Sequence, residues 1–150
     1  MPVNHSLYSS KLEEGLSVLQ CELVAERNKE NPNNITWFQY DLLESLYHSK
    51  GSLPAQLSCN LGVSRSKVSK ALKGLKDIGY IHQIQGTGDG REFFTQLTKD
   101  GLSFLNSTKA GHRHLEQTAS AVLTPSEQEL FAEFCLRVAQ AFQERRKSNE

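Results

Sequence analysis

The stretch from Leu61 to Tyr80, LGVSRSKVSKALKGLKDIGY, constrains the fold more than any other part of the chain. Gly62 permits a turn with positive φ, and Ser64 is a favourable N-cap for a helix that follows the turn. Apolar residues of this helix recur at the 3.6-residue period and therefore share one face, which predicts a buried underside. These residues are Val68, Ala71, Leu72 and Leu75.

The opposite face of the same helix is basic, although the chain as a whole is neutral. The protein has 17 basic and 17 acidic side chains, yet residues 65–76 contain no carboxylate, and the nearest acid upstream is Glu44. Charge that cancels overall but segregates locally favours binding of an oppositely charged partner. The cations that face outward or flank this face are Arg65, Lys67, Lys70, Lys73 and Lys76.

The segments on either side of this helix predict a winged helix-turn-helix. Ser52 is expected to cap a short helix over 53–60, whose Leu57 and Leu61 point inward. After Gly79, expected as a left-handed helix cap, residues 80–85 and 92–97 alternate as strands around the glycine-rich turn GTGDGR. The predicted fold class is mostly α with a small β-hairpin wing.

Helices are also expected on both sides of this domain. Residues 6–26 predict a helix that is apolar on two faces, a pattern that favours packing against a second subunit. Two capping boxes, Thr36 with Gln39 and Thr124 with Glu127, predict further helix starts, and Thr98 is expected to cap a helix that ends near Val122. We therefore predict an N-terminal dimerisation helix and linker at 1–34, a DNA-binding domain at 35–105 and C-terminal dimerisation helices at 106–150.

The major groove of DNA admits a helix, and the basic helix has the residues that such binding requires. Amides of its first turn, after Ser64, are expected to meet a phosphate. Lysines are expected to supply affinity, whereas arginine and the serines are candidates for sequence specificity, with Lys73 nearer the DNA backbone. The predicted DNA-binding residues on this helix are Ser64, Arg65, Ser66, Lys67, Ser69, Lys70 and Lys73.

From Ile35 to about Leu105 the sequence resembles the multiple antibiotic resistance regulator (MarR) family of transcription factors. The resemblance is carried by LGVSRSKVSKALKGLKDIGYI, by DGR at 89–91, which matches the DxR of the family's wing, and by LTKDG at 97–101, which matches its LTxxG. It implies a homodimer with interleaved terminal helices that binds a pseudo-palindromic operator on double-stranded DNA. It also implies that Arg91 enters a minor groove and that Asp89 orients Arg91 or the wing. In this family such a regulator is more often a repressor, relieved by a small-molecule inducer or by oxidation. The connection at 28–34 is shorter than the family's usual extension, and Ser58 stands where alanine is common.

Other classes of protein are less well supported by the sequence. It has no nucleophile elbow, phosphate loop or HExxH, so we expect no enzyme and no cofactor. His112 and His114 are two residues apart and diverge on a helix, so no metal site is predicted, although a metal-dependent sensor stays an alternative.

Cys135 is expected in the core, whereas Cys21 and Cys59 are candidate redox thiols. No apolar run is long enough for a membrane span, which favours a cytoplasmic protein. A winged helix that binds only another protein is the second alternative.

Overall fold

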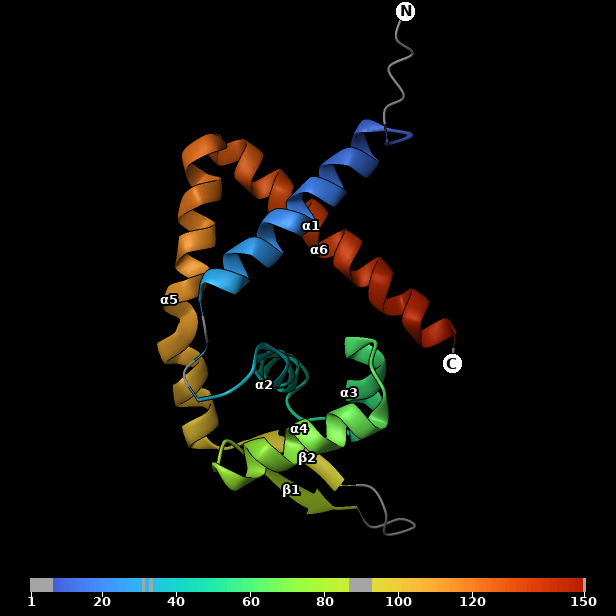
Figure 1. The fold of residues 1–150 in the computed structure, drawn as a ribbon, viewed down its shortest axis with the longest axis vertical. Coiled ribbons are helices and arrows are strands. Elements are labelled where there is room, and N and C mark those ends of the chain that lie inside the picture. The colour runs from blue at the N-terminus through green and yellow to red at the C-terminus, as the bar shows by residue number, and fades with distance from the viewer. Residues whose placement is uncertain (1–6, 31, 33, 87–92, 150) are drawn as a thin grey trace, which may run out of the picture. The chain divides into compact units, whose positions relative to one another are not determined.

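The computed structural model covers residues 1–150 and describes residues 7–30, 32, 34–86 and 93–149 (Figure 1). Contacts within the chain form two compact units, residues 1–33 and residues 34–150. The predicted boundary near residue 34 lies close to the junction of these units. The predicted boundary at 105 falls inside a continuous helix of the second unit, and the three-part division stays a prediction.

Among its described residues, the first unit has one helix, α1 (Lys11–Lys29). Its predicted bounds, 6–26, were wrong by several residues, because the hydroxyl of Ser10 accepts the amide of Glu13 at 3.0 Å and so caps the helix there. The carboxylate of Glu13 also accepts the amide of Ser9 at 2.7 Å and the hydroxyl of Ser9. Hydrogen bonds from the hydroxyl and amide of Ser9 hold the pKa of Glu13 below its usual value.

The second unit begins with α2 (Trp37–Ser49), which supplies the centre of the core. The predicted capping box is confirmed, since Thr36 accepts the amide of Gln39 at 3.1 Å and the side chain of Gln39 accepts the amide of Thr36 at 3.0 Å. Phe38 is half-buried and packs against the core, and Tyr40 is buried within it. The core joins α2 to the next two helices, the first strand and the start of α5, and it consists of Ile35, Tyr40, Leu42, Leu43, Leu46, Leu57, Val68, Leu72, Leu75, Ile81, Phe104 and Leu105.

Helix α3 (Pro54–Leu61) follows, and its predicted cap was wrong. Leu53 occupies the N-cap position, and its amide donates to the side chain of Gln56 at 3.0 Å. Ser52 is buried because its backbone pairs with that of Thr95 through two 2.9 Å hydrogen bonds. Ser52 is thus held by a residue distant in sequence, and α3 begins at Pro54, after Leu53 as the N-cap.

Helix α4 (Arg65–Asp77) leads into an antiparallel hairpin of β1 (Ile81–Gln85) and β2 (Phe93–Leu97). Gly79, with φ +82°, follows the end of α4 as predicted. The two strands also form as predicted, with β1 beginning one residue later than expected. Figure 1 shows the hairpin beside α4, at the end of the second unit opposite the α5–α6 turn.

The LTKDG segment joins the hairpin to α5 (Lys99–Val122) and holds the two together. Thr98 caps α5 by accepting the amide of Gly101 at 3.1 Å, while its own hydroxyl donates to Gly79 O at 2.6 Å and its amide donates to Tyr80 O at 3.1 Å. A Cβ on Gly101 would lie 2.1 Å from Tyr80 O, so only glycine allows this approach. The motif therefore has a structural role here.

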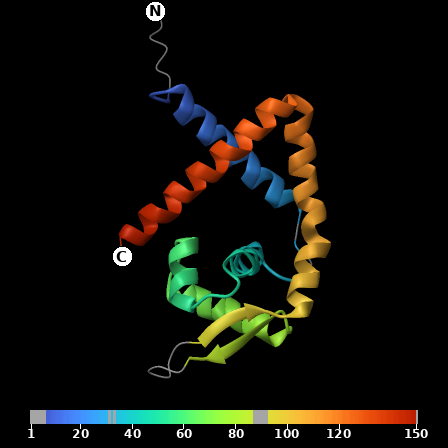
Figure 2. The same cartoon turned by 180° about the vertical axis from the view of Figure 1, so that it is seen from behind.

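Helix α6 (Pro125–Ser148) starts at the predicted capping box of Thr124 and Glu127. No residue of α6 is buried, so the prediction that Cys135 lies in the core was wrong for a single chain. The helix turns back from α5, and its C-terminal end lies beside α3 in both views (Figure 1, Figure 2). In the part of the chain that the structure describes, no helix is long and apolar enough to cross a membrane.

Candidate nucleic-acid interface

Helices α3 and α4 form the predicted helix-turn-helix, and local hydrogen bonds fix the turn between them. Gly62 adopts a left-handed conformation with φ +65°, and Ser64 caps α4 by accepting the amide of Lys67 at 3.2 Å. Ser58, at the alanine position of such motifs, donates its hydroxyl to Val63 O at 2.5 Å, and the amide of Val63 donates to Ser58 O at 3.1 Å. These bonds join the end of α3 to the turn.

The two faces of α4 differ as the sequence predicted. Val68, Leu72 and Leu75 are buried on the inner face, each at most 3% exposed. The rigid inner face holds the opposite side of the helix at the surface. All seven residues predicted to bind DNA from this helix are exposed, namely Ser64, Arg65, Ser66, Lys67, Ser69, Lys70 and Lys73.

Lys67 has a partner that the sequence did not indicate. Its Nζ lies 4.6 Å from the centroid of the Phe38 ring, a cation–π contact between α4 and α2. Such contacts contribute about 0.5–1 kcal/mol at exposed sites, enough to favour one position of a flexible ammonium group. The half-buried position of Phe38 is consistent with this contact, because its ring packs on the core and also faces a surface cation.

A groove of about 400 Å³ runs between α3, α4 and the hairpin. Three cations line it, and none of its described lining residues is acidic, so the groove is electropositive. Two polar residues that were not among the predicted site residues, Lys76 and Gln83, belong to it. Its lining consists of Pro54, Ala55, Arg65, Ser69, Leu72, Lys73, Lys76, Gln83 and Phe93.

The hairpin has the position of a wing beside α4. Its strands pair from Ile81 with Leu97 to Gln85 with Phe93. Thr95 anchors it from a fully buried position, where its hydroxyl accepts from Gln83 Nε2 and donates to Phe93 O, each at 3.2 Å. The predicted wing residues Asp89 and Arg91 lie outside the described residues.

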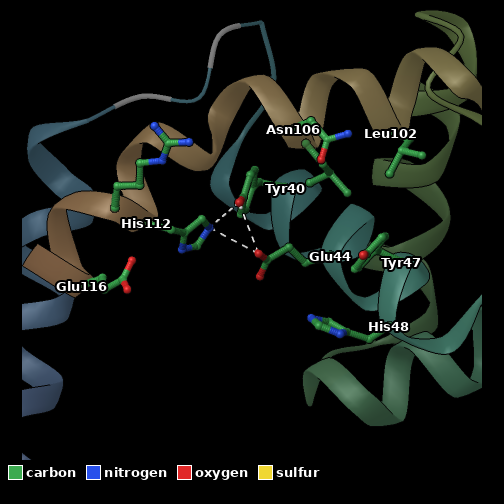
Figure 3. Close-up of a pocket in the computed structure, with 10 residues that line it drawn as sticks. Tyr40, Glu44, Tyr47, His48, Leu102, Asn106, His112 and Glu116 are labelled. Carbon is green, nitrogen blue, oxygen red and sulfur yellow. Dashed lines mark hydrogen bonds and ion pairs between the residues drawn. The ribbon is translucent and has the colours of Figure 1, made fainter. Parts of the chain in front are cut away.

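A second hollow, of about 430 Å³, lies between α2 and α5 (Figure 3). Three polar side chains meet on its wall. Glu44 Oε1 accepts from the hydroxyl of Tyr40 at 3.2 Å and lies 3.2 Å from His112 Nε2, which also hydrogen bonds to Tyr40. Tyr40 and Glu44 belong to α2 and His112 belongs to α5, so this network ties the helix-turn-helix domain to a C-terminal helix. The sequence marked His112 only as half of an HxH pair.

Among the described residues, no group of three or more histidine, cysteine, aspartate or glutamate side chains is placed to hold a metal ion. The three cysteines are free thiols, with Cys21 and Cys135 exposed and Cys59 half-buried.

Comparisons with known proteins agree with this architecture. Residues 35–93 match the model of the MarR family. The chain is 30% identical over 117 residues to "Transcriptional repressor MprA" of Escherichia coli K12, a match that covers 75% of this chain and 66% of that relative. The match thus spans slightly less than two thirds of the relative's length.

Solved structures share the fold. A MarR protein from Peptoclostridium difficile superimposes with a TM-score of 0.75 at 15% identity, covering 97% of this chain and 95% of that one. FabT from Streptococcus pneumoniae, solved in complex with DNA, gives a TM-score of 0.66 at 19% identity and covers 89% and 96% of the two chains. The family model thus places residues 35–93 in the MarR family, the related repressor agrees with this assignment, and the solved structures share the winged helix-turn-helix fold.

Proposed function

We propose that the chain is a sequence-specific, DNA-binding transcriptional regulator that acts as a homodimer. The observation that carries this proposal is the exposed basic face of α4, which is held outward by a buried inner face and has no carboxylate from Arg65 to Lys76. A DNA complex has been solved for FabT, which shares the fold. MarR-family members are transcriptional regulators rather than enzymes, in agreement with the absence of catalytic motifs from the sequence.

The roles of the α4 side chains follow from their positions. Lys70 and Lys73 are exposed cations suited to phosphates, while Arg65, at the start of α4 and in the electropositive groove, is suited to a base edge. Ser64, Ser66 and Ser69 can donate hydrogen bonds to phosphates or bases from the same face. Lys67, placed over Phe38, is better suited to a flanking phosphate than to a base. Arg91 and Asp89 keep their proposed wing roles.

Homodimer formation is supported by apolar side chains that the chain leaves exposed on α6. Phe131, Phe134 and Phe142 are 41%, 48% and 52% exposed, and Leu136 is 72% exposed. Monomeric proteins rarely expose so many large apolar residues on one helix. A second copy that covers α6 would also place two α4 helices on one duplex, where successive major grooves lie roughly 34–36 Å apart.

Repression is the favoured output, since the related MprA is named a transcriptional repressor. We propose that a small molecule relieves it by binding the hollow between α2 and α5. A ligand there would compete with the hydrogen bonds among Tyr40, Glu44 and His112, and so loosen the tie between the two helices. A shift of α2 against α5 changes the separation of the two α4 helices, and therefore the affinity for DNA. Oxidation of a cysteine thiol is the alternative signal, with Cys21, which is exposed, and Cys59, which is half-buried, as the candidates.

Salt titration of DNA binding tests the proposal. The logarithm of the binding constant should fall linearly with the logarithm of the salt concentration, because phosphate contacts release counterions. Replacing Lys70 with alanine should weaken binding to all duplexes and reduce the slope by about one unit for each bound protomer. The matched control is Lys99→Ala, which removes the same charge from an exposed position outside the groove. Its slope should equal that of the wild type.

Two results would contradict the proposal. If no duplex binds at low salt, the winged helix is an interaction module for another protein. If Lys70→Ala and Lys99→Ala change the slope equally, the basic face of α4 is not the DNA-binding surface.

A further inference from the structure

One side chain near the end of α6 reaches the helix-turn-helix. Arg146 donates from Nε to Cys59 O at 3.2 Å and from Nη2 to Asn60 O at 2.9 Å. It is half-buried, whereas most residues of α6 are exposed. These bonds connect α6 to the DNA-binding domain, and they join residues 87 and 86 positions apart in the sequence.

The carbonyls that Arg146 binds belong to the C-terminal turn of α3. The last carbonyls of a helix lack partners four residues ahead and carry partial negative charge, so a cation is favourable there. The amide of Gly62 bonds Cys59 O at 3.2 Å, which leaves Asn60 O available for the guanidinium. A planar guanidinium can donate to two neighbouring acceptors at once, whereas an ammonium group acts as a point charge.

The position of this contact connects it to DNA binding. The turn that starts at Gly62 leads directly to Ser64, the N-cap of α4, and the Ser58–Val63 hydrogen bonds make the end of α3 and the turn one rigid piece. The stem of Arg146 packs on that piece, since a Cβ on Gly62 would lie 3.5 Å from Arg146 Cδ. Arg146 therefore contacts the segment that leads directly into the start of the recognition helix.

We infer that Arg146 is a positioning residue that couples the dimerisation helix α6 to the turn of the helix-turn-helix and so sets the separation of the two recognition helices in the dimer. This inference rests on the proposed DNA-binding function. The domain is joined to α5 by the covalent passage from β2, by the packing of α5 in the core and by the hydrogen bonds of His112 to α2. The contact of Arg146 with α3 instead holds the C-terminal end of α6 to the domain. Its loss leaves that end of α6 free to move relative to the turn.

The dependence of affinity on half-site spacing tests this role. A palindromic duplex is first selected from a random pool by the full-length wild-type dimer, and one base pair is then added to or removed from its centre. Each change moves the half-sites by about 3.4 Å, so a rigidly positioned pair of recognition helices should bind the altered duplexes much more weakly. Arg146→Ala is compared with Arg145→Ala, which removes the same charge from an exposed neighbour.

Arg146→Ala should bind the selected duplex about five- to tenfold more weakly, a size typical of coupling between sites, and should show a smaller penalty on the altered duplexes. Arg145→Ala should keep the wild-type spacing profile. Arg146→Lys should recover part of the discrimination, because an ammonium group can still donate to one of the two carbonyls.

Two outcomes overturn the inference while leaving the proposed function intact. Either Arg146→Ala keeps the spacing profile of Arg145→Ala, or it weakens all spacings equally together with a lower melting temperature, as a purely structural role requires. Failure of the wild type to bind any duplex at low salt overturns the proposed function, and the inference with it.

Discussion

Replacement of Gly101 with alanine should destabilise the protein, although alanine is the better helix former. A Cβ at this position would lie 2.1 Å from Tyr80 O and 3.0 Å from Tyr80 C. Even weak C–H···O contacts keep carbon and oxygen about 3.3 Å apart, so the first turn of α5 must move away from the hairpin by roughly 1 Å. Both neighbours are backbone atoms, which cannot rotate out of the way.

The size of the effect follows from the contacts that this movement disturbs. Two hydrogen bonds join Thr98 to the backbone of Gly79 and Tyr80, and their loss costs about 1–3 kcal/mol at roughly 0.5–1.5 kcal/mol each. Overpacking adds about 1–3 kcal/mol. The better helix propensity of alanine returns about 1 kcal/mol. We therefore expect a loss of about 1–5 kcal/mol in the free energy of unfolding, centred near 3 kcal/mol.

Urea unfolding followed by far-UV circular dichroism measures this loss. All variants are compared at one protomer concentration, because the stability of a dimer depends on it. Gly15→Ala is the matched control, since Gly15 also lies inside a helix and a Cβ there meets nothing within 4 Å. That control should be neutral or up to about 1 kcal/mol more stable. If Gly101→Ala unfolds at the same urea concentration as the wild type or a higher one, the close approach of α5 to Tyr80 does not exist and the structural account of LTKDG is wrong.

Two further predictions concern the wing and pH. Arg91→Ala should reduce affinity most for operators whose flanks have narrow, A·T-rich minor grooves. Titration of duplex pairs that differ only in their flanks measures this, and equal losses of affinity on G·C-rich flanks would show that the wing is not inserted. Hydrogen bonds from Ser9 lower the pKa of Glu13, so their contribution to the stability of the start of α1 should be fully present above the ordinary glutamate pKa. This contribution should be lost as the pH falls through the lowered pKa of Glu13. An NMR titration should show the pKa of Glu13 rising toward its usual value in Ser9→Ala, and an unchanged pKa in that variant would rule out the hydrogen bond from the Ser9 hydroxyl to the Glu13 carboxylate.

The parts of the fold that the sequence predicted correctly depend on neighbours in the sequence. The capping boxes at Thr36 and Thr124 and the cap at Ser64 use side chains only three residues away, so their signal is present in any short window. The buried underside of α4 follows from the same local period. The basic face could therefore be placed at the surface before the structure was known.

Several errors and omissions depend on contacts between distant residues. Ser52 looked like a cap but pairs with Thr95 across the domain, and Lys67 lies over Phe38, which is on a different helix. No period or motif in the sequence marks such pairs. The same holds for His112 with Glu44, and for the guanidinium of Arg146 at the end of α3.

The wrong prediction that Cys135 lies in the core has a different cause. The apolar stripe of α6 that contains Cys135 exists, but it stays exposed in a single chain. Periodicity predicts that a face will be buried, and it does not say by which molecule. The second unit closes its core with residues from Ile35 to Leu105, while α6 contributes none of them. Stability of the winged helix and assembly of the regulator are therefore separable. Substitutions in the apolar stripe of α6 should affect DNA binding through loss of the second subunit, whereas those at buried positions such as Leu57 should unfold the domain itself.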